Sequence, residues 1–489
     1  MCGDNHYEEV IDKMMLDLID PKLQEKIMVL DRKYQRLAIL SLLDKDRSLF
    51  MSIKNIVKEN KVTKVNHVKD VIKMLREYVK VGEVEKKKYG EVMTPLELVK
   101  DMIQTIPTDF WKNPNSKILD PANGVGPFPI MVVYRLMMGL KDWEPDEEKR
   151  YKHIMENMIH VCELQPKNMF LWMVAVDPED TYELNVFNGS FLSPEFDIHM
   201  KNVWGVEKFD LILGNPPYQE RKEGFKKTQS IWQFFVEKSM LILSDGGYLN
   251  MVHPSGWRNV DGIYKNVQNL LKSKQILSLV MRNTKDGLNT FGANIEYDYY
   301  CVKNSCCYDG FSTRINDVNY ESYREDISKM DFIPNSDLKL VFSMVAKNGE
   351  EKVKILFSRS AYGNDKSHMS KIKNEEFKYP CVYTVGALNP NFLYSNVKKE
   401  MFGIPKVIWG NGLTDVIIDE KGDFGLTNFA YAIVDNTENL ENIKKALKNK
   451  RFIHDVMGYT KGVGHIYNHK VISTFRKDFW KEFINEENN

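Results

Sequence analysis

The chain has 489 residues, of which 43% are hydrophobic, and this is enough for two or three domains with sizeable cores. Lys plus Arg and Asp plus Glu are equal at 68 each, which argues against a protein that coats nucleic acid through net charge alone. The six cysteines form no Cys-x-x-Cys pair, and no stretch is long and apolar enough for a transmembrane helix. We therefore expect a reduced, cytoplasmic protein with no membrane association and no metal site.

The first 85 residues are charge-rich, and their apolar residues recur at helical spacing, as at Leu30, Leu37 and Leu40. They predict an N-terminal helical region that acts as a cap or docking segment. Residues 89–95, Tyr-Gly-Glu-Val-Met-Thr-Pro, follow it, and apolar residues at helical spacing come next. A Thr-Pro at this position is typical of a helix start.

A short strand at 117–120 is followed by the turn 121–126, Pro-Ala-Asn-Gly-Val-Gly, and by a predicted helix over 127–140. This series is typical of the opening unit of a nucleotide-binding doubly wound fold. The turn lacks the third glycine of the dinucleotide fingerprint and the Gly-Lys-Ser/Thr of a P-loop. Because Asp120 stands at its start, the turn suits a ligand that carries an ammonium group rather than a phosphate.

A second strand, 159–162, ends at Glu163, where a carboxylate can accept hydrogen bonds from a ribose diol. Glu163 lies farther from Asp120 than the usual spacing of about 20 residues. An inserted helix within the charged stretch 141–157 accounts for the difference. A third strand at 184–186 leads into Asn-Gly-Ser-Phe-Leu at 188–192.

The most informative stretch is 209–218, Phe-Asp-Leu-Ile-Leu-Gly-Asn-Pro-Pro-Tyr. An apolar strand over 209–213 delivers Asn215, Pro216, Pro217 and Tyr218 to the sheet edge where ligands bind in open α/β sheets. The Asn215 side-chain oxygen and a proline carbonyl can each accept one hydrogen from an exocyclic amino group, which makes that nitrogen nucleophilic. The ring of Tyr218 offers a face on which a base can stack.

Taken together, these positions resemble the S-adenosylmethionine-dependent DNA adenine-N6 methyltransferases of the gamma group, similar to restriction-modification methylases of the TaqI/Eco57I type. In that group the cofactor motifs come first, Asn-Pro-Pro-Tyr next and target recognition last. The resemblance covers 86–305 in detail and the remainder only in general layout. It implies an α/β fold with a Rossmann-like, mostly parallel sheet at 86–305, after the helical region 1–85. It also implies an α+β target-recognition (DNA-binding) domain at 306–489.

The resemblance assigns roles to individual residues. Phe191 is expected against the cofactor adenine. Phe291, in a loop between two predicted strands, is expected to stack on a flipped-out base from the side opposite Tyr218, with an ordinary loop-to-core phenylalanine as the alternative. At Ser190 the chain departs from the family, which usually carries an Asp that binds the cofactor's amino group. A hydroxyl accepts that bond more weakly, or Asn188 accepts it instead. The full set expected around S-adenosylmethionine is Thr94, Asp120, Pro121, Ala122, Asn123, Gly124, Gly126, Glu163, Ser190 and Phe191.

Beyond Tyr218, a basic, glycine-containing loop at 219–229 is well placed to hold DNA phosphates. Its candidate contacts are Arg221, Lys222, Lys226 and Lys227. A helix at 230–243, a turn at 244–247 and strands at 248–252, 276–281 and 295–302 complete the predicted sheet. The region after 310 mixes short strands with helices, among them a strand near 406–411 and a helix at 439–450. His465 and His469 lie four residues apart, but the nearby glycines argue against a metal-binding helix.

Other readings share these features. Asn-Pro-Pro-Tyr also serves methyltransferases that act on rRNA guanine amino groups or on a protein glutamine amide, and cytosine-N4 methyltransferases are a closer rival. A non-catalytic specificity or assembly subunit would carry a broken tetrad, and this one is intact. The expected substrate is double-stranded DNA in a bacterial cytoplasm or, for a phage or virus protein, in its host. A separate restriction endonuclease, the recognition sequence and the oligomeric state stay open.

Overall fold

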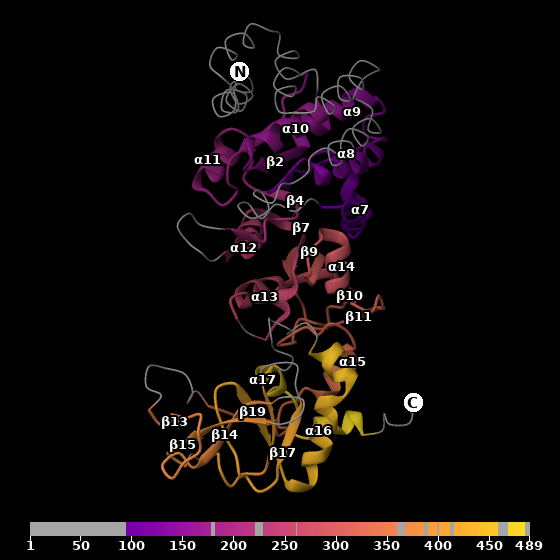
Figure 1. Cartoon of the computed structure of the whole chain (residues 1–489). Helices are drawn as coiled ribbons and strands as arrows, with labels where there is room; N and C mark the ends of the chain where they lie inside the picture. Colours follow the sequence, from indigo (N-terminus) through magenta and orange to yellow (C-terminus); the bar gives the residue numbers. More distant parts are fainter. Residues whose placement is uncertain are drawn as a thin grey trace, which may run out of the picture. The chain divides into compact units, whose positions relative to one another are not determined.

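A computed structural model of the chain describes residues 94–177, 181–220, 228–260, 262–358, 367–385, 390–398, 401–410, 415–457 and 468–484. They form two compact units, which are described separately (Figure 1). Unit 1 comprises the described residues up to Pro254, with Asn266–Asn316 and Glu321–Ser328. Unit 2 comprises Ser255–Lys265, Asp317–Tyr320 and the described residues from Lys329 onward. The predicted N-terminal helical region lies outside the described residues.

A nine-stranded sheet organises unit 1, in the order β11-β10-β8-β9-β7-β4-β1-β2-β3. Its strands are β1 (Ile118–Asp120), β2 (Ile159–Glu163), β3 (Asn185–Asn188), β4 (Phe209–Gly214), β7 (Leu243–Pro254), β8 (Lys274–Arg282), β9 (Tyr297–Cys306), β10 (Thr313–Asn316) and β11 (Ser322–Glu325). The neighbours from β3 to β7 pair in parallel, whereas β9 lies antiparallel between β7 and β8. This confirms the α/β class with a mostly parallel sheet.

The strand order places a topological switch point between β1 and β4. From β1 the chain continues to β2 and β3 on one side, and it returns to β4 and β7 on the other. Ile118 pairs with Ile159 of β2 and with Leu211 of β4, so β1 is a central strand, and all its residues are buried. Ligands of open α/β sheets bind outside the carboxyl ends of the strands at such a point. Asp120, Glu163 and Gly214 end β1, β2 and β4 at that edge.

Helices cover this sheet. They are α7 (Leu96–Gln104), α8 (Pro127–Gly139), α9 (Glu147–His153), α10 (Pro166–Val176), α11 (Pro194–Asn202), α12 (Trp232–Ile242), α13 (Lys265–Lys272) and α14 (Thr284–Phe291). The helix start predicted at Thr94-Pro95 corresponds to α7, and the predicted helices at 127–140 and 230–243 correspond to α8 and α12. The inserted helix predicted within 141–157 is α9, followed by a π-helical turn, Ile154–Met158. The core between helices and sheet includes Met102, Val133, Trp172 and Leu211.

Three local predictions require correction. The turn expected at 244–247 is part of β7, where Gly246 has φ 76° and the pairing with β4 shifts register between Phe209 and Leu211. Phe291 is not in a loop: it is the last residue of α14, which begins at a capping box formed by Asn283 and Asp286. The sheet also continues past residue 305 through β10 and β11.

Unit 2 combines two four-stranded sheets, β12-β19-β16-β17 and β13-β15-β14-β18, with short helices. Its strands are β12 (Lys354–Phe357), β13 (Met369–Ser370), β14 (Tyr379–Val385), β15 (Pro390–Ser395), β16 (Lys406–Gly410), β17 (Val416–Asp419), β18 (Gly425–Leu426) and β19 (Ala430–Val434). Its helices are α15 (Leu338–Met344), α16 (Leu440–Lys448) and α17 (His469–Ile472). The predicted strand near 406–411 and helix at 439–450 correspond to β16 and α16.

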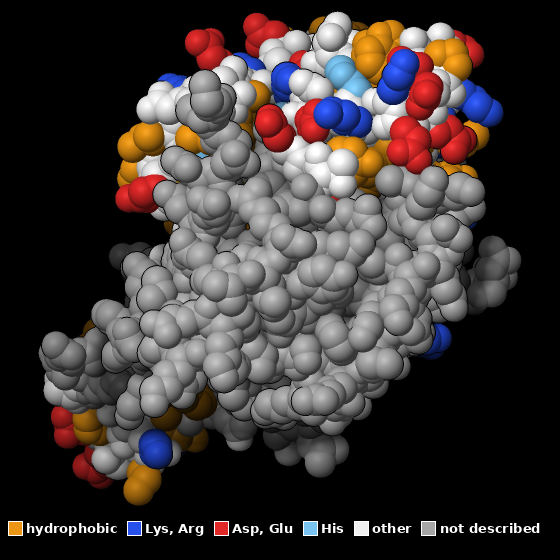
Figure 2. Space-filling view, turned by 90° about the horizontal axis from the view of Figure 1, so that it is seen from above, with side chains coloured by type: hydrophobic (Ala, Val, Ile, Leu, Met, Phe, Trp, Pro, Cys, Tyr) orange, Lys and Arg blue, Asp and Glu red, His pale blue; other side chains and the backbone are white. Residues whose placement is uncertain are grey.

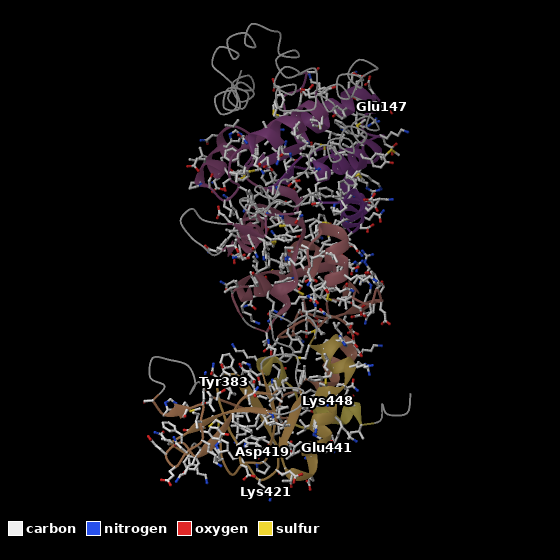
Figure 3. All side chains as sticks on the ribbon, in the orientation of Figure 1. Glu147, Tyr383, Asp419, Lys421, Glu441 and Lys448 are labelled. Carbon is white, nitrogen blue, oxygen red and sulfur yellow. The ribbon has the colours of Figure 1, made fainter. Side chains whose placement is uncertain are left out.

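A buried ion pair joins β16 to β17 in unit 2. Lys406 Nζ, which is fully buried, donates to Asp419 Oδ2 at 2.6 Å, and Asp419 is labelled in Figure 3. Lys406 also donates to the carbonyls of Met401 and Ile404, and Asp419 accepts from the backbone of Asp423 and Phe424. These bonds compensate the loss of hydration of both charges and fix the loop after β17.

The described surface is of mixed charge. In Figure 2, acidic and basic side chains are interspersed over the coloured part of the face, which matches the balanced composition. Among the described helices, none combines the length and apolar character needed to cross a bilayer.

Candidate active site

The turn after β1 is shaped by two glycines with left-handed backbone. Gly124 has φ 57° and Gly126 has φ 89°. At Gly126 a side chain is excluded as well, because an added Cβ would lie 1.9 Å from the Trp172 ring. The turn is tied down by Asn123 N, which donates to Cys162 O of β2 at 2.9 Å. The sequence Pro-Ala-Asn-Gly-Val-Gly therefore turns sharply around the end of β1 and leads directly into α8.

Asp120 ends β1 with its side chain almost fully buried, at 1% exposure. Its Oδ1 accepts a hydrogen bond from Ala122 N at 3.0 Å, while Oδ2 is buried without a hydrogen-bond partner among the described residues. Burial raises the pKa of Asp120 to about 8; the bond from Ala122 lowers it, and the nearby Glu163 raises it further. A buried, unpaired carboxyl oxygen of this kind favours a cationic or hydrogen-donating ligand group.

Glu163 connects the turn with the neighbouring strand. Its Oε2 accepts from Gly124 N at 2.7 Å and its Oε1 from Gln165 N at 2.8 Å. Glu163 is thus fixed at the end of β2, with its side chain in the wall of a cavity.

The Asn-Pro-Pro-Tyr loop leaves the end of β4 next to Asp120. An added Cβ at Gly214 would lie 2.9 Å from Asp120 Oδ1, so the two strand ends are in close approach. Asn215 Nδ2 donates to Thr94 Oγ1 at 3.0 Å, whereas Asn215 Oδ1 is buried and has no partner among the described residues. The amide therefore presents an uncommitted acceptor at the place where the sequence predicted one.

Tyr218 is held by its backbone, because Ile231 N donates to Tyr218 O at 3.2 Å. Its hydroxyl is buried and has no partner in the described part of the chain, and burial raises the pKa of Tyr218 well above its usual value of 10. The side chain consequently acts as a neutral aromatic surface. Phe291 is next to it, with ring centroids 6.2 Å apart, but the ring planes are perpendicular at 87°. The two rings meet edge to face, and the sandwich of a base between them stays a prediction.

A cavity of about 260 Å³ lies at this sheet edge. It brings together the turn after β1, the end of β2, the segment after β3 and the Asn-Pro-Pro-Tyr loop. Of the predicted residues, its wall contains Pro121, Ala122, Gly124, Glu163, Ser190, Phe191, Asn215, Pro216, Pro217 and Tyr218. Thr94, Asp120, Asn123, Gly126 and Phe291 are not among the residues that line it.

The wall also contains residues that the sequence analysis missed, such as Gln165 and Asn168 from the start of α10 and Phe235 from α12. A signal for the first two was present: Pro166 directly after a strand end is typical of a helix start. Phe235 stacks on Phe191, with centroids 5.4 Å apart and planes 29° apart, and leaves Phe191 only 1% exposed.

Ser190, which stands where the family usually carries an Asp, and the nearby Asn188 differ in their hydrogen bonds. Ser190 Oγ accepts a hydrogen bond from Leu192 N at 3.3 Å, so the hydroxyl already serves the local turn. Asn188 Nδ2 donates to Glu163 O, while Asn188 Oδ1 is buried and unpartnered within the described residues. The candidate DNA contacts Arg221, Lys222, Lys226 and Lys227 lie outside the described residues, as does His465.

The segment that matches a known protein family includes β4 and the Asn-Pro-Pro-Tyr loop, whereas the glycine-rich turn precedes it. Residues 132–286 match the family described as Eco57I restriction-modification methylase. The resemblance predicted from the motifs is thereby confirmed for this segment.

Two individual proteins are also similar to parts of this chain. An uncharacterized adenine-specific methylase of Mycoplasma pneumoniae is 25% identical over 255 residues, covering 38% of this chain and 60% of that protein. The modification methylase CviBIII of Paramecium bursaria Chlorella virus NC1A is 24% identical over 288 residues, covering 52% of this chain and 67% of the relative. The chain thus spans about three fifths of the Mycoplasma relative. Among solved structures, the Type IIL restriction-modification enzyme MmeI in complex with DNA has a TM-score of 0.49 and 10% identity, covering 81% of this chain and 70% of that one.

Proposed function

We propose that this chain is a DNA methyltransferase that transfers a methyl group from S-adenosylmethionine to N6 of an adenine flipped out of duplex DNA. The observation that carries the proposal is Asn215 Oδ1, a buried acceptor just after β4 that has no hydrogen-bond partner among the described residues and belongs to a residue in the wall of the cavity that also contains Glu163. An exocyclic amino group is a donor that satisfies such an oxygen. The matched family and the two relatives, an adenine-specific methylase and a modification methylase, support the same chemistry.

The residues fit the proposed cofactor. Asp120 Oδ2 and Asn188 Oδ1 are buried acceptors without partners among the described residues, and they suit the ammonium and amino groups of S-adenosylmethionine. Glu163 suits the ribose hydroxyls, since it ends β2 beside the cavity. When bound, S-adenosylmethionine supplies an electrophilic methyl group. Ser190, with its hydroxyl in a local turn, is the least suited of the predicted contacts.

The chain's own contribution is positioning. Asn215 Oδ1 and the carbonyl of Pro216 accept the two hydrogens of the amino group, which directs the nitrogen lone pair away from the ring and into the cavity. The neutral ring of Tyr218 stacks on the base, and a contact of this kind contributes about 1–3 kcal/mol, which offsets part of the few kcal/mol needed to flip the base. Positioning and polarisation supply most of the rate enhancement in such a site.

Two parts of the proposal concern the partners. Unit 2 is proposed to recognise the DNA sequence, and the basic loop 219–229 to contact phosphates around the flipped base. A separate restriction endonuclease is proposed as a further partner.

The test is transfer of labelled methyl from S-adenosylmethionine to mixed-sequence duplex DNA, followed by mass spectrometry of the nucleosides. N6-methyladenine is the expected product, and the Asn215→Ala protein serves as the matched negative control. N4-methylcytosine, or label found only in RNA or protein, would replace the proposed substrate by one of the alternatives. Cofactor binding without any transfer would indicate a non-catalytic subunit.

A further inference from the structure

The orientation of the Asn215 amide decides whether this loop accepts or donates hydrogen bonds. The two ends of a primary amide are alike in shape, but the oxygen accepts hydrogen bonds and the nitrogen donates them. To bind the substrate's amino group, the amide must direct its oxygen, and not its nitrogen, toward that group. In this structure Nδ2 donates to Thr94 Oγ1 at 3.0 Å, and Oδ1 is left buried without a partner among the described residues.

Thr94 is itself held firmly. It is 3% exposed and directly precedes Pro95, from which α7 begins. At the other end of α7, Asn250 Nδ2 donates to Met102 O at 3.0 Å and to Thr105 Oγ1 at 2.8 Å. Asn250 pairs with Leu213, two residues before Asn215. Helix α7 is therefore attached to the β4–β7 pair at both ends.

We propose that Thr94 is a positioning residue, whose hydroxyl oxygen fixes the Asn215 amide with Oδ1 toward the substrate amino group. This deepens the proposed function and rests on it. It differs from the role that the family resemblance assigns, because Thr94 Oγ1 accepts a hydrogen bond from Asn215 Nδ2. Without that acceptor, Nδ2 loses its partner and the amide is free to rotate into the orientation that repels an amino group.

The test compares Thr94→Val, which is nearly isosteric but lacks the hydroxyl, with Thr94→Ser, which retains it. We expect kcat to fall about tenfold in Thr94→Val, the scale of one lost hydrogen bond, while the Kd for S-adenosylmethionine changes less than about threefold. Thr94→Ser should restore kcat to within about threefold of the wild type. Thr105→Val is the matched control: it loosens the other end of α7 and should lower Tm, yet change kcat less than about twofold.

Three results would overturn the assignment. An unchanged kcat in Thr94→Val would show that the hydroxyl does not orient the amide. A Kd for S-adenosylmethionine weakened at least tenfold, with kcat intact at saturation, would make Thr94 a cofactor contact. An equal loss of kcat in Thr105→Val would show that the fall of kcat in Thr94→Val comes from a general loosening of α7.

A measurement independent of activity separates this inference from the proposed function. In protein carrying isotope-labelled asparagine, the side-chain amide resonance of Asn215, identified by its loss in Asn215→Asp, should shift in Thr94→Val and return in Thr94→Ser. If the wild type methylates nothing, the proposed function fails, and this resonance still decides whether Thr94 orients the amide. A resonance that does not move in Thr94→Val refutes the contact.

Discussion

Asp120 makes the stability of the ligand-free protein depend on pH in an unusual direction. The carboxyl is 1% exposed, and burial raises its pKa from 3.8 to about 8. Between these values the folded protein holds a proton that the unfolded chain has released. The free energy of unfolding therefore contains a contribution that is fully present below about pH 4 and is lost as the pH rises toward about 8. The loss is at most about 1.4 kcal/mol per pH unit.

Asp120→Asn removes this titration while keeping the size of the side chain and an oxygen that can accept from Ala122 N. Urea unfolding of both proteins at pH 5.5 and pH 7.5 isolates the effect, since all other groups titrate alike. Between these two pH values the wild type should lose about 2–3 kcal/mol relative to Asp120→Asn. Parallel pH profiles for the two proteins would refute the reasoning, because they would mean that Asp120 is ionised in the folded state.

The same group links protonation to ligand binding. A cationic ligand beside Oδ2 favours the ionised carboxylate, so binding at pH 7 should release close to one proton in the wild type. Titration calorimetry with S-adenosylmethionine in buffers of different ionisation enthalpy measures that release. Asp120→Asn should release none.

Three further substitutions test the site. Asn215→Ala should lower the rate of methyl transfer at least about 100-fold, the scale seen when one oriented polar group is removed from a site. The Kd for S-adenosylmethionine should change little. Retained turnover in the transfer assay would rule out the proposed role of the amide. Gly126→Ala should lower the free energy of unfolding by several kcal/mol in thermal or urea unfolding, because the new Cβ would lie 1.9 Å from the Trp172 ring. Gly124→Ala, whose Cβ would have no atom within 4 Å, should lower it by only about 1 kcal/mol. Equal losses of stability in the two variants would show that backbone strain alone, and not the contact with Trp172, causes the effect. In a fluorescence titration, Tyr218→Phe should bind DNA like the wild type, since the hydroxyl has no partner in the described part of the chain. Tyr218→Ala should weaken DNA binding by about 1–3 kcal/mol. Weaker DNA binding by Tyr218→Phe would instead indicate that the hydroxyl contacts the DNA.

The central strands could be predicted because buried parallel strands read as continuous apolar runs. Phe209–Gly214 and Ile159–Glu163 are mostly apolar, each with one polar residue inside, and Gly214 and Glu163 end them at the edge of the sheet. The helices α10 and α11 were not predicted. After Lys167 and Asn168 every residue of α10 is apolar, so the helix lacks the amphipathic period. The prolines at its start and at that of α11 were the helix signals.

The details of the site were beyond prediction for a different reason. The identity of the loop residues followed from local sequence, but their partners come from distant segments. Asn215 and Thr94 are 121 positions apart, and Gly124 and Glu163 are 39 apart. Similarly, the perpendicular contact of Phe291 with Tyr218 depends on α14, whose end at Gly292 fixes where the ring lies.

The arrangement of the strands explains why these partners meet. Because β1 lies between β2 and β4, the residues that end these strands converge on one edge. The return of the chain from β3 to β4 brings Gly214, which directly precedes Asn215, beside Asp120. Helix α7, attached to β7 through Asn250, carries Thr94 to the same edge from outside the sheet. The acceptor oxygens of Asp120 and Asn215, like that of Asn188, are buried there without a hydrogen-bond partner among the described residues. Buried oxygens of that kind lower stability unless a ligand supplies donors, so their conjunction is better explained by binding than by packing.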